Sequence, residues 1–139
     1  MSGAFLRGVI IDTSSILFGF ANGKNAIEIV RLHFHSTPIM ISKGILRELL
    51  AKSKNNGLKG MSARLSMMAV SNSGVKIIDS NINPDRWIIS KSESGMIVVT
   101  NDTALARQSS KMGATVYKLS KDGKLRKFIN AKAPVSVGT

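Results

Sequence analysis

The chain has 139 residues, no cysteine, two histidines and a formal net charge of +12, from 20 lysines and arginines against 8 aspartates and glutamates. The lack of cysteine excludes disulfides and thiolate zinc sites, and two histidines alone cannot build a histidine-rich metal site. The length and the 43% hydrophobic content favour one compact domain, while the charge favours a polyanionic partner such as nucleic acid.

Short apolar runs alternate with helical patterns from residue 7 onward. We expect strands at residues 7–11, 38–41, 75–78, 96–99 and 115–119. We expect helices at residues 14–20, 25–34, 42–52, 58–71 and 103–111, and a further helix that begins at Asn83 and Pro84. Ser42 is the expected N-cap of its helix. Strands that alternate with helices predict an α/β fold with a mostly parallel sheet.

Two segments of this pattern carry a more specific expectation. The helix at 58–71 is expected to be buried through Met61, Leu65, Met68 and Ala69. Beyond the strand at 115–119 the chain becomes basic and then small and polar, so we expect no further strand. Residues 1–128 are expected to form the domain, and residues 129–139 a flexible C-terminal tail.

No apolar run reaches the roughly 18–20 residues that span a bilayer. Asp12 interrupts the only apolar run near the N-terminus before it reaches the length of a signal-peptide core. We therefore expect a cytoplasmic protein with no membrane partner.

Four of the eight acids stand at unusual positions. Asp12 directly follows the first strand, and Asp102 lies shortly after the strand at 96–99. Glu48 lies within an apolar helix, and Asp85 opens a helix behind Pro84. Because ligands of such sheets bind beyond the carboxyl ends of the strands, all four acids are expected at one edge.

Carboxylates that share a cleft repel one another, by roughly 4 kcal/mol for a pair at ~4 Å and an effective dielectric of 20. A bound cation removes this cost, and all-oxygen ligands favour Mg²⁺, Mn²⁺ or Ca²⁺ over zinc or copper. In a basic protein the natural substrate of such a site is a phosphodiester. Each acid taken alone is equally consistent with a structural role, as a helix cap or a solvated side chain.

Glycine-rich phosphate loops are absent. No G-x-G-x-x-G follows the first strand, and no G-x-x-x-x-G-K-[ST] occurs. A small nucleotide-binding α/β protein is therefore a weaker interpretation, since clustered carboxylates repel phosphate unless a metal intervenes.

Four segments together resemble the PIN-domain nucleases. They are Val-Ile-Ile-Asp-Thr-Ser at 9–14, Gly-Ile-Leu-Arg-Glu-Leu at 44–49, Asp-Arg-Trp-Ile at 85–88 and Val-Val-Thr-Asn-Asp at 98–102. The resemblance runs from about residue 7 to residue 128. Each motif is short, and the order and spacing of all four make the match specific.

The resemblance implies a three-layer α/β/α fold and a Mg²⁺- or Mn²⁺-dependent endoribonuclease that acts on single-stranded or loop regions of RNA, commonly as a homodimer. By this likeness the catalytic and metal-binding residues are Asp12, Glu48, Asp85 and Asp102. Ser14, Thr100 and Asn101 would support them.

Two branches of the family fit. The ribosomal RNA processing type is similar at the end of the domain, where a strand leads into the basic residues 124–127. The VapC-type toxins have this length and are neutralised by an antitoxin. A catalytically weak RNA-binding module in a ribonucleoprotein particle is the remaining alternative, because Arg86 stands where many members carry a further acid. Ser14 stands at a position where many members of the family carry asparagine.

Several cationic residues are candidates for contact with RNA. They are Arg86, Lys52, Lys54, Lys59, Arg64, Lys124, Arg126 and Lys127. Trp87, two residues from Asp85, is suited either to stack on a base near the site or to pack against the sheet.

Overall fold

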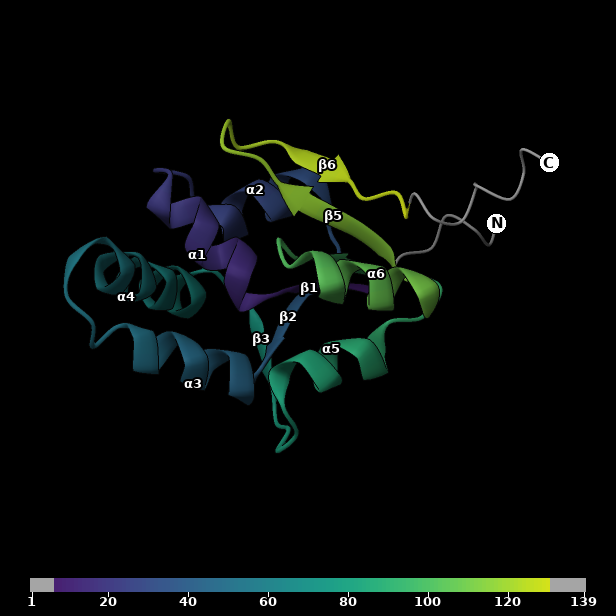
Figure 1. Cartoon of the computed structure of the whole chain (residues 1–139), viewed down its shortest axis with the longest axis horizontal. Helices are drawn as coiled ribbons and strands as arrows, with labels where there is room; N and C mark the ends of the chain where they lie inside the picture. Colours follow the sequence, from purple (N-terminus) through teal and green to yellow (C-terminus); the bar gives the residue numbers. More distant parts are fainter. Residues whose placement is uncertain (1–6, 131–139) are drawn as a thin grey trace.

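A six-stranded sheet with the order β3-β2-β1-β4-β5-β6 forms the centre of the computed structural model, which describes residues 7–130 (Figure 1). The strands are β1 Gly8–Ile11, β2 Ile39–Ser42, β3 Lys76–Ile78, β4 Met96–Val99, β5 Thr115–Leu119 and β6 Leu125–Lys127. The first five are parallel to their neighbours, and β6 pairs antiparallel with β5. Every residue of β1 and β4 is buried, which explains their continuous apolar sequences.

Helices cover both faces of the sheet. They are α1 Thr13–Ala21, α2 Ala26–His33, α3 Lys43–Lys52, α4 Gly57–Asn72, α5 Pro84–Lys91 and α6 Thr103–Lys111. Right-handed crossovers put α1 to α4 on one face and α5 and α6 on the other. Figure 1 shows α1, α3 and α4 on one side of the strands and α5 and α6 on the other. The predicted three-layer α/β/α fold with a mostly parallel sheet is confirmed.

The predicted helix caps are also present. The Ser42 hydroxyl accepts from the Ile45 backbone N–H at 3.2 Å and so begins α3. The Asn83 side chain accepts from the Asp85 N–H at 2.9 Å, with Pro84 in the first turn of α5. These caps matter for the site because α3 carries Glu48 and α5 carries Asp85.

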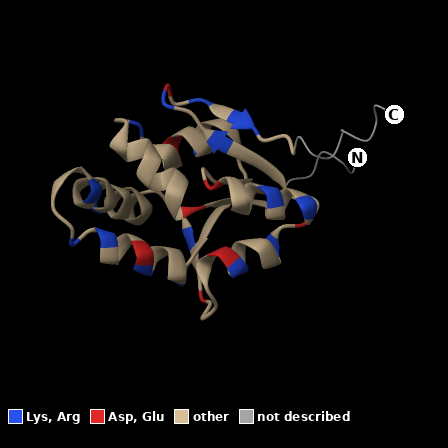
Figure 2. Cartoon of the chain, viewed as in Figure 1, with Lys and Arg blue, Asp and Glu red and all other residues tan. Residues whose placement is uncertain are grey.

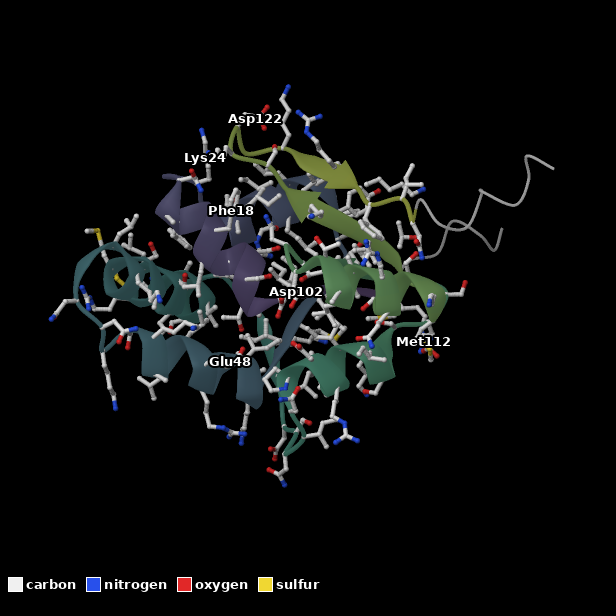
Figure 3. All side chains as sticks on the ribbon, in the orientation of Figure 1. Phe18, Lys24, Glu48, Asp102, Met112 and Asp122 are labelled. Carbon is white, nitrogen blue, oxygen red and sulfur yellow. The ribbon has the colours of Figure 1, made fainter. Side chains whose placement is uncertain are left out.

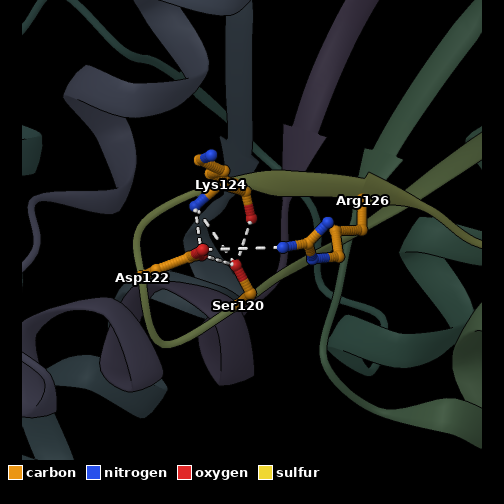
Figure 4. A network of polar contacts seen from close by, with 4 residues as sticks. All are labelled: Ser120, Asp122, Lys124 and Arg126. Atoms are coloured by element: carbon orange, nitrogen blue, oxygen red, sulfur yellow. Dashed lines mark hydrogen bonds and ion pairs between the residues drawn. The ribbon is translucent and has the colours of Figure 1, made fainter.

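The expectation that the sheet ends at residue 119 is wrong. A turn at residues 120–124 reverses the chain, and β6 adds to the edge of the sheet with Leu125 opposite Leu119. Gly123 has a φ of +84°, which side chains other than glycine rarely adopt. In Figure 4 the side chains of Ser120 and Asp122 bind the Lys124 backbone N–H across this turn. The predicted tail at 129–139 lies almost wholly outside the described residues.

The predicted buried face of α4 is wrong as well. Met61, Leu65 and Met68 are exposed by 50%, 38% and 60%, and Ala69 is half-buried. The face turned inward consists of small residues and one valine, namely Gly60, Ser62, Ala63, Ser66 and Val70. Both faces repeat at helical spacing, and the small one is buried because it lets α4 lie close against α1 and α3.

Among residues 7–130, no helix is long and apolar enough to cross a membrane.

The α3 cap yields a stability prediction. Ser42→Ala leaves the buried Ile45 N–H without its partner and should lower the free energy of unfolding by about 0.5–2 kcal/mol in urea denaturation. Ser71→Ala, at an exposed position of α4, is the matched control and should change stability by less than about 0.5 kcal/mol. Equal stability of the two variants would contradict the role given to Ser42.

Candidate functional site

The site begins where β1 and β4 end side by side. Ile11 pairs with Val99, so the residues that follow, Asp12 and Thr100, leave the sheet together. The Asp12 backbone N–H continues the pairing by donating to the Val99 carbonyl at 2.9 Å. Asp12 is only 5% exposed and Thr100 is fully buried. The Asp12 carboxylate is thus buried at the carboxyl ends of the two central strands.

Two hydroxyl groups hold the Asp12 carboxylate in place. Its Oδ2 atom accepts from Ser14 Oγ at 2.7 Å and from Thr100 Oγ1 at 2.9 Å. The two hydroxyl oxygens lie 3.3 Å apart, so the three side chains form one cluster. Hydrogen bonds to the charged form of a carboxylate are strong and fix its orientation. In this structure the hydroxyl groups of Ser14 and Thr100 therefore orient the Asp12 carboxylate directly.

The same cluster orients the start of α6. Ser14 Oγ accepts from the Asn101 N–H, and Thr100 Oγ1 accepts from the Asp102 N–H, each at 3.0 Å. Asp102 then caps α6, with Oδ1 accepting from the Leu105 N–H at 3.2 Å. Asp102 thus fills the capping role that its sequence position also allowed, with one of its two carboxylate oxygens, whereas Asp12 makes no side-chain cap bond to α1.

Asn101 acts as a brace between three elements. Its Oδ1 accepts from Ser15 Oγ at 2.6 Å and from the Leu119 N–H at 3.1 Å. Its Nδ2 donates to the Leu119 carbonyl at 2.9 Å. The side chain thereby joins α1, the start of α6 and the end of β5. Its support of the acids is indirect and comes from holding the loop that carries Asp102.

The sequence did not predict the contact between Thr13 and Glu48. The buried Oγ1 of Thr13 donates to Glu48 Oε1 at 2.6 Å and links the start of α1 to the middle of α3. Thr13 stands next to Asp12 in the first motif, but nothing in its spacing predicts a partner 35 residues away. Only the packing of α3 beside α1 makes this pair.

The four acids line a single open cavity of about 440 Å³ at this edge. Asp12 follows β1, Glu48 lies on α3, Asp85 on α5 and Asp102 before α6. Ser14, Leu17 and Lys52 line the same cavity. Figure 3 shows Glu48 and Asp102 on facing elements around the centre of this edge. The elements therefore bring together all four acids that the sequence singled out.

Each acid keeps at least one oxygen without a hydrogen bond among residues 7–130. Asp12, Glu48 and Asp102 each use one oxygen in the contacts above. Neither oxygen of Asp85 accepts a bond within this part of the chain. The cavity thus presents uncommitted carboxylate oxygens from four directions.

The acids repel one another across the cavity. Desolvation, followed by the charges of Asp12, Asp102 and Glu48, raises the pKa of Asp85 above its ordinary value. This happens although Asp85 lies in the first turn of α5, where the helix dipole favours a negative charge. Repulsion by the other three acids is the electrostatic relation that a bound cation would reverse.

No group of three or more Asp, Glu or His side chains in residues 7–130 is close enough to form a ready-made metal site. Two of the four acids are engaged elsewhere by one oxygen, because Glu48 accepts from Thr13 and Asp102 caps α6. The acids share a cavity without meeting at one point.

The candidate RNA-binding residues fall into separate groups. Lys52 lines the acid cavity, and Lys59 lines a second cavity beside it. Lys54 lies in the turn between α3 and α4, and Arg64, in the middle of α4, donates back to the Ser53 carbonyl of this turn at 2.7 Å. Arg86 is exposed next to Asp85 and does not line the acid cavity.

The remaining three, Lys124, Arg126 and Lys127, lie in the β5–β6 hairpin and do not line the acid cavity. Figure 2 shows blue segments on this hairpin and on the helices of both faces. Arg126 pairs with Asp122 at 3.5 Å, as Figure 4 shows. Asp122 thus offsets part of the positive charge of the hairpin.

Trp87 packs in the core and does not face the acids. It is 3% exposed and borders a different cavity, together with Arg7 and Glu93 near the amino end of β4. Of the two roles considered for Trp87, packing against the sheet is confirmed, and its burial excludes stacking on a base near the site. Residues two positions apart in a helix lie on different faces of it, so Trp87 and Asp85 point in different directions from α5.

Comparison with solved structures identifies the fold. The structure of the PIN domain endonuclease Utp24 superposes with a TM-score of 0.69 at 20% sequence identity, over 86% of this chain and 90% of that one. A domain of a functionally unknown protein from Methanocaldococcus jannaschii gives a TM-score of 0.57 at 17% identity, over 89% and 99%. No protein-family model and no curated protein sequence matches the chain. The chain has the PIN-domain fold, as its motifs predict.

The raised pKa of Asp85 leads to a test of the repulsion. When folding raises the pKa of a carboxyl group, the protonated group stabilises the folded state relative to the unfolded state. This stabilisation is lost as the pH rises through the pKa of the folded state. Without divalent metal, Asp85→Asn should therefore stabilise the protein at pH 7, by less than about 1 kcal/mol because the group is exposed. The gain should shrink as the pH falls below about 4, where aspartate is protonated in both states.

Urea denaturation in EDTA at pH 7 and pH 3.5 measures this difference. Asp122→Asn is the control of opposite sign, because the Ser120 hydroxyl lowers the pKa of Asp122 and its charge favours the folded state. Destabilisation by Asp85→Asn at pH 7 would contradict the raised pKa of Asp85.

Proposed function

We propose that this protein is a divalent-metal-dependent endoribonuclease that cleaves phosphodiester bonds in RNA. The observation that carries the proposal is the arrangement of the acids. Asp12, Glu48, Asp85 and Asp102 come from four elements and line one cavity at the carboxyl edge of the sheet. The fold that presents them is shared with a PIN domain endonuclease.

The donor set fits a hard divalent cation. Carboxylate and hydroxyl oxygens favour Mg²⁺ or Mn²⁺ over zinc or copper. In this proposal Asp12, Glu48, Asp85 and Asp102 hold the metal through the oxygens that make no other bond. A bound ion of this kind polarises the phosphoryl oxygen and supplies a hydroxide-like nucleophile at neutral pH. Relief of the repulsion on Asp85 would favour binding.

The protein's own groups supply orientation. Ser14 and Thr100 both donate to Asp12 Oδ2 and so fix the orientation of the carboxylate group. The other oxygen, Oδ1, remains free to bind the metal. Thr13 orients Glu48 in the same way. Lys52, on the wall of the cavity one helical turn after Glu48, is placed to attract the phosphate of the strand. Such fixed geometry removes much of the entropic cost of reaction.

RNA is the substrate that the charge and the family likeness support. The net charge of +12 attracts a polyanion strongly, and the open cavity admits a single strand. We assign the activity to residues 1–128 and favour a role in ribosomal RNA processing, because a basic segment at 124–127 ends the domain. Arg86 beside Asp85 supports a second candidate, an RNA-binding module with weak cleavage.

Mutation of the acids tests the proposal. Asp12→Asn and Asp102→Asn should each lower the cleavage rate of a loop-containing RNA in Mn²⁺ or Mg²⁺ by more than about 100-fold. This exceeds the 10–100-fold that loss of a residue behind a metal ligand typically costs. The measurement is the appearance of cut fragments on a denaturing gel, with circular dichroism to verify folding.

Glu93→Gln is the matched control, because Glu93 is an exposed acid near the amino end of β4. The Glu93→Gln variant should cleave RNA at the rate of the wild type. Undiminished cutting by the two aspartate variants would exclude these residues from the reaction. Salt-sensitive RNA binding without cleavage in either metal would favour the RNA-binding module.

A further inference from the structure

A second cavity, of about 330 Å³, lies beside the acid cavity between α1, α3 and α4. Its walls are mainly apolar, with Leu17, Phe18 and Ala21 from α1 and Leu58 from α4. Figure 3 labels Phe18 on α1, on the side of the sheet where Figure 1 places α4. Ser14, Leu17 and Lys52 line both cavities, so the two are adjacent.

One wall of this apolar cavity carries an unpaired buried hydroxyl. Ser62 on α4 is 2% exposed, and its Oγ atom has no hydrogen-bond partner among the described residues. Buried polar groups in native proteins nearly always have a partner, so an orphaned hydroxyl at the wall of a cavity calls for one. Ser66, one turn later on the same helix, instead satisfies its hydroxyl on the Ser62 carbonyl at 2.6 Å.

We propose that this cavity binds one nucleobase of the RNA strand whose scissile phosphate lies at the four acids. A base is a flat apolar ring system with polar atoms along its edge. The apolar side chains of α1 and α4 match the ring, and rotation of the Ser62 side chain at the cavity wall would bring its covered hydroxyl to the edge. The site rests on the proposed nuclease function and adds the position at which the enzyme recognises its substrate.

The charges around the cavity suit a nucleotide. Lys52 lies at the junction of the two cavities and Lys59 at the wall of the apolar one, so the backbone phosphates on either side of the bound base would meet cations. Stacking on apolar and aromatic side chains combined with a basic groove is the usual way in which proteins bind single strands. Leu17, which both cavities share, would separate the base from the acids.

Size and charge argue against other occupants. The volume is at the lower end of the roughly 300–1,000 Å³ typical of small-ligand pockets, which fits one nucleotide unit better than an inserted helix. A second copy of this chain would bring its own Lys52 and Lys59 to the same surface. Like charges brought together in this way oppose self-association.

A walk of single abasic sites through a short RNA tests the site. The affinity of the full chain for 10-nucleotide RNAs, each lacking one base, is measured by fluorescence anisotropy in EDTA. Loss of the base at one position should weaken binding by about fivefold or more, the factor that corresponds to the lower limit of base stacking. Losses at other positions should have smaller effects.

Two variants assign this effect to the cavity. Ala21→Trp, at an exposed position of the cavity wall, should weaken binding of intact RNA by a similar factor and remove the difference between intact and abasic RNA. Ser62→Ala should abolish any preference among the four bases at the sensitive position. Ala104→Trp on α6 and Ser71→Ala on α4 are matched controls at exposed positions and should behave as the wild type.

The outcomes separate this site from the nuclease proposal. RNA that is cut and bound with no dependence on any single base would overturn the base site alone. Base-dependent binding without cleavage in Mn²⁺ or Mg²⁺ would overturn the nuclease and leave the base site standing. The absence of any RNA binding would overturn the base site. So would a wild-type dimer, detected by light scattering, that Ala21→Trp dissociates, because a second copy of the chain would then be the occupant of the cavity.

Discussion

The pairing of β1 with β4 is the constraint on which the site depends. These two fully buried strands lie next to each other at the centre of the sheet although 84 residues separate their ends, from Ile11 to Met96. Their register brings Asp12 beside Thr100, and the Asp12–Ser14–Thr100 cluster closes over that junction. From it follow the orientation of Asp12, the start of α6 and the position of Asp102. A change of register at β4 would move all of these together.

Charge in this molecule is divided between two tasks. The net charge of +12 acts at long range and attracts a polyanion, whereas half of the eight acids line a single cavity. Hydrogen bonds of 2.6–3.2 Å orient three of these acids, and the fourth, Asp85, lacks such a partner among the described residues. Desolvation, followed by the charges of the other three acids, raises the pKa of Asp85. A structure that keeps such repulsion in a cavity is suited to bind a cation there.

The helix α4 shows how packing decides between two similar faces. Its apolar stripe and its face of small residues both repeat at helical spacing, so the pattern alone favours burial of the larger side chains. Instead the small residues are buried where α4 packs on α1 and α3, and Gly60 leaves room for the Asn55 carbonyl of the preceding turn. Ser62, on this buried face, lines the apolar cavity next to the acids. The proposed base site therefore borders the face of α4 that the sequence pattern did not predict to be buried.

Local sequence patterns were enough to predict the order of the first five strands and six helices, the caps at Ser42 and Asn83, and the four acids with their hydroxyl neighbours. Those features depend on local periodicity and on side chains that bond to their own backbone, so they can be read from neighbouring residues. The tertiary structure decided the contact of Thr13 with Glu48, the addition of β6, the burial of Trp87 and the inward face of α4. Each of these depends on which segments far apart in the chain lie against one another, and local pattern does not contain that information.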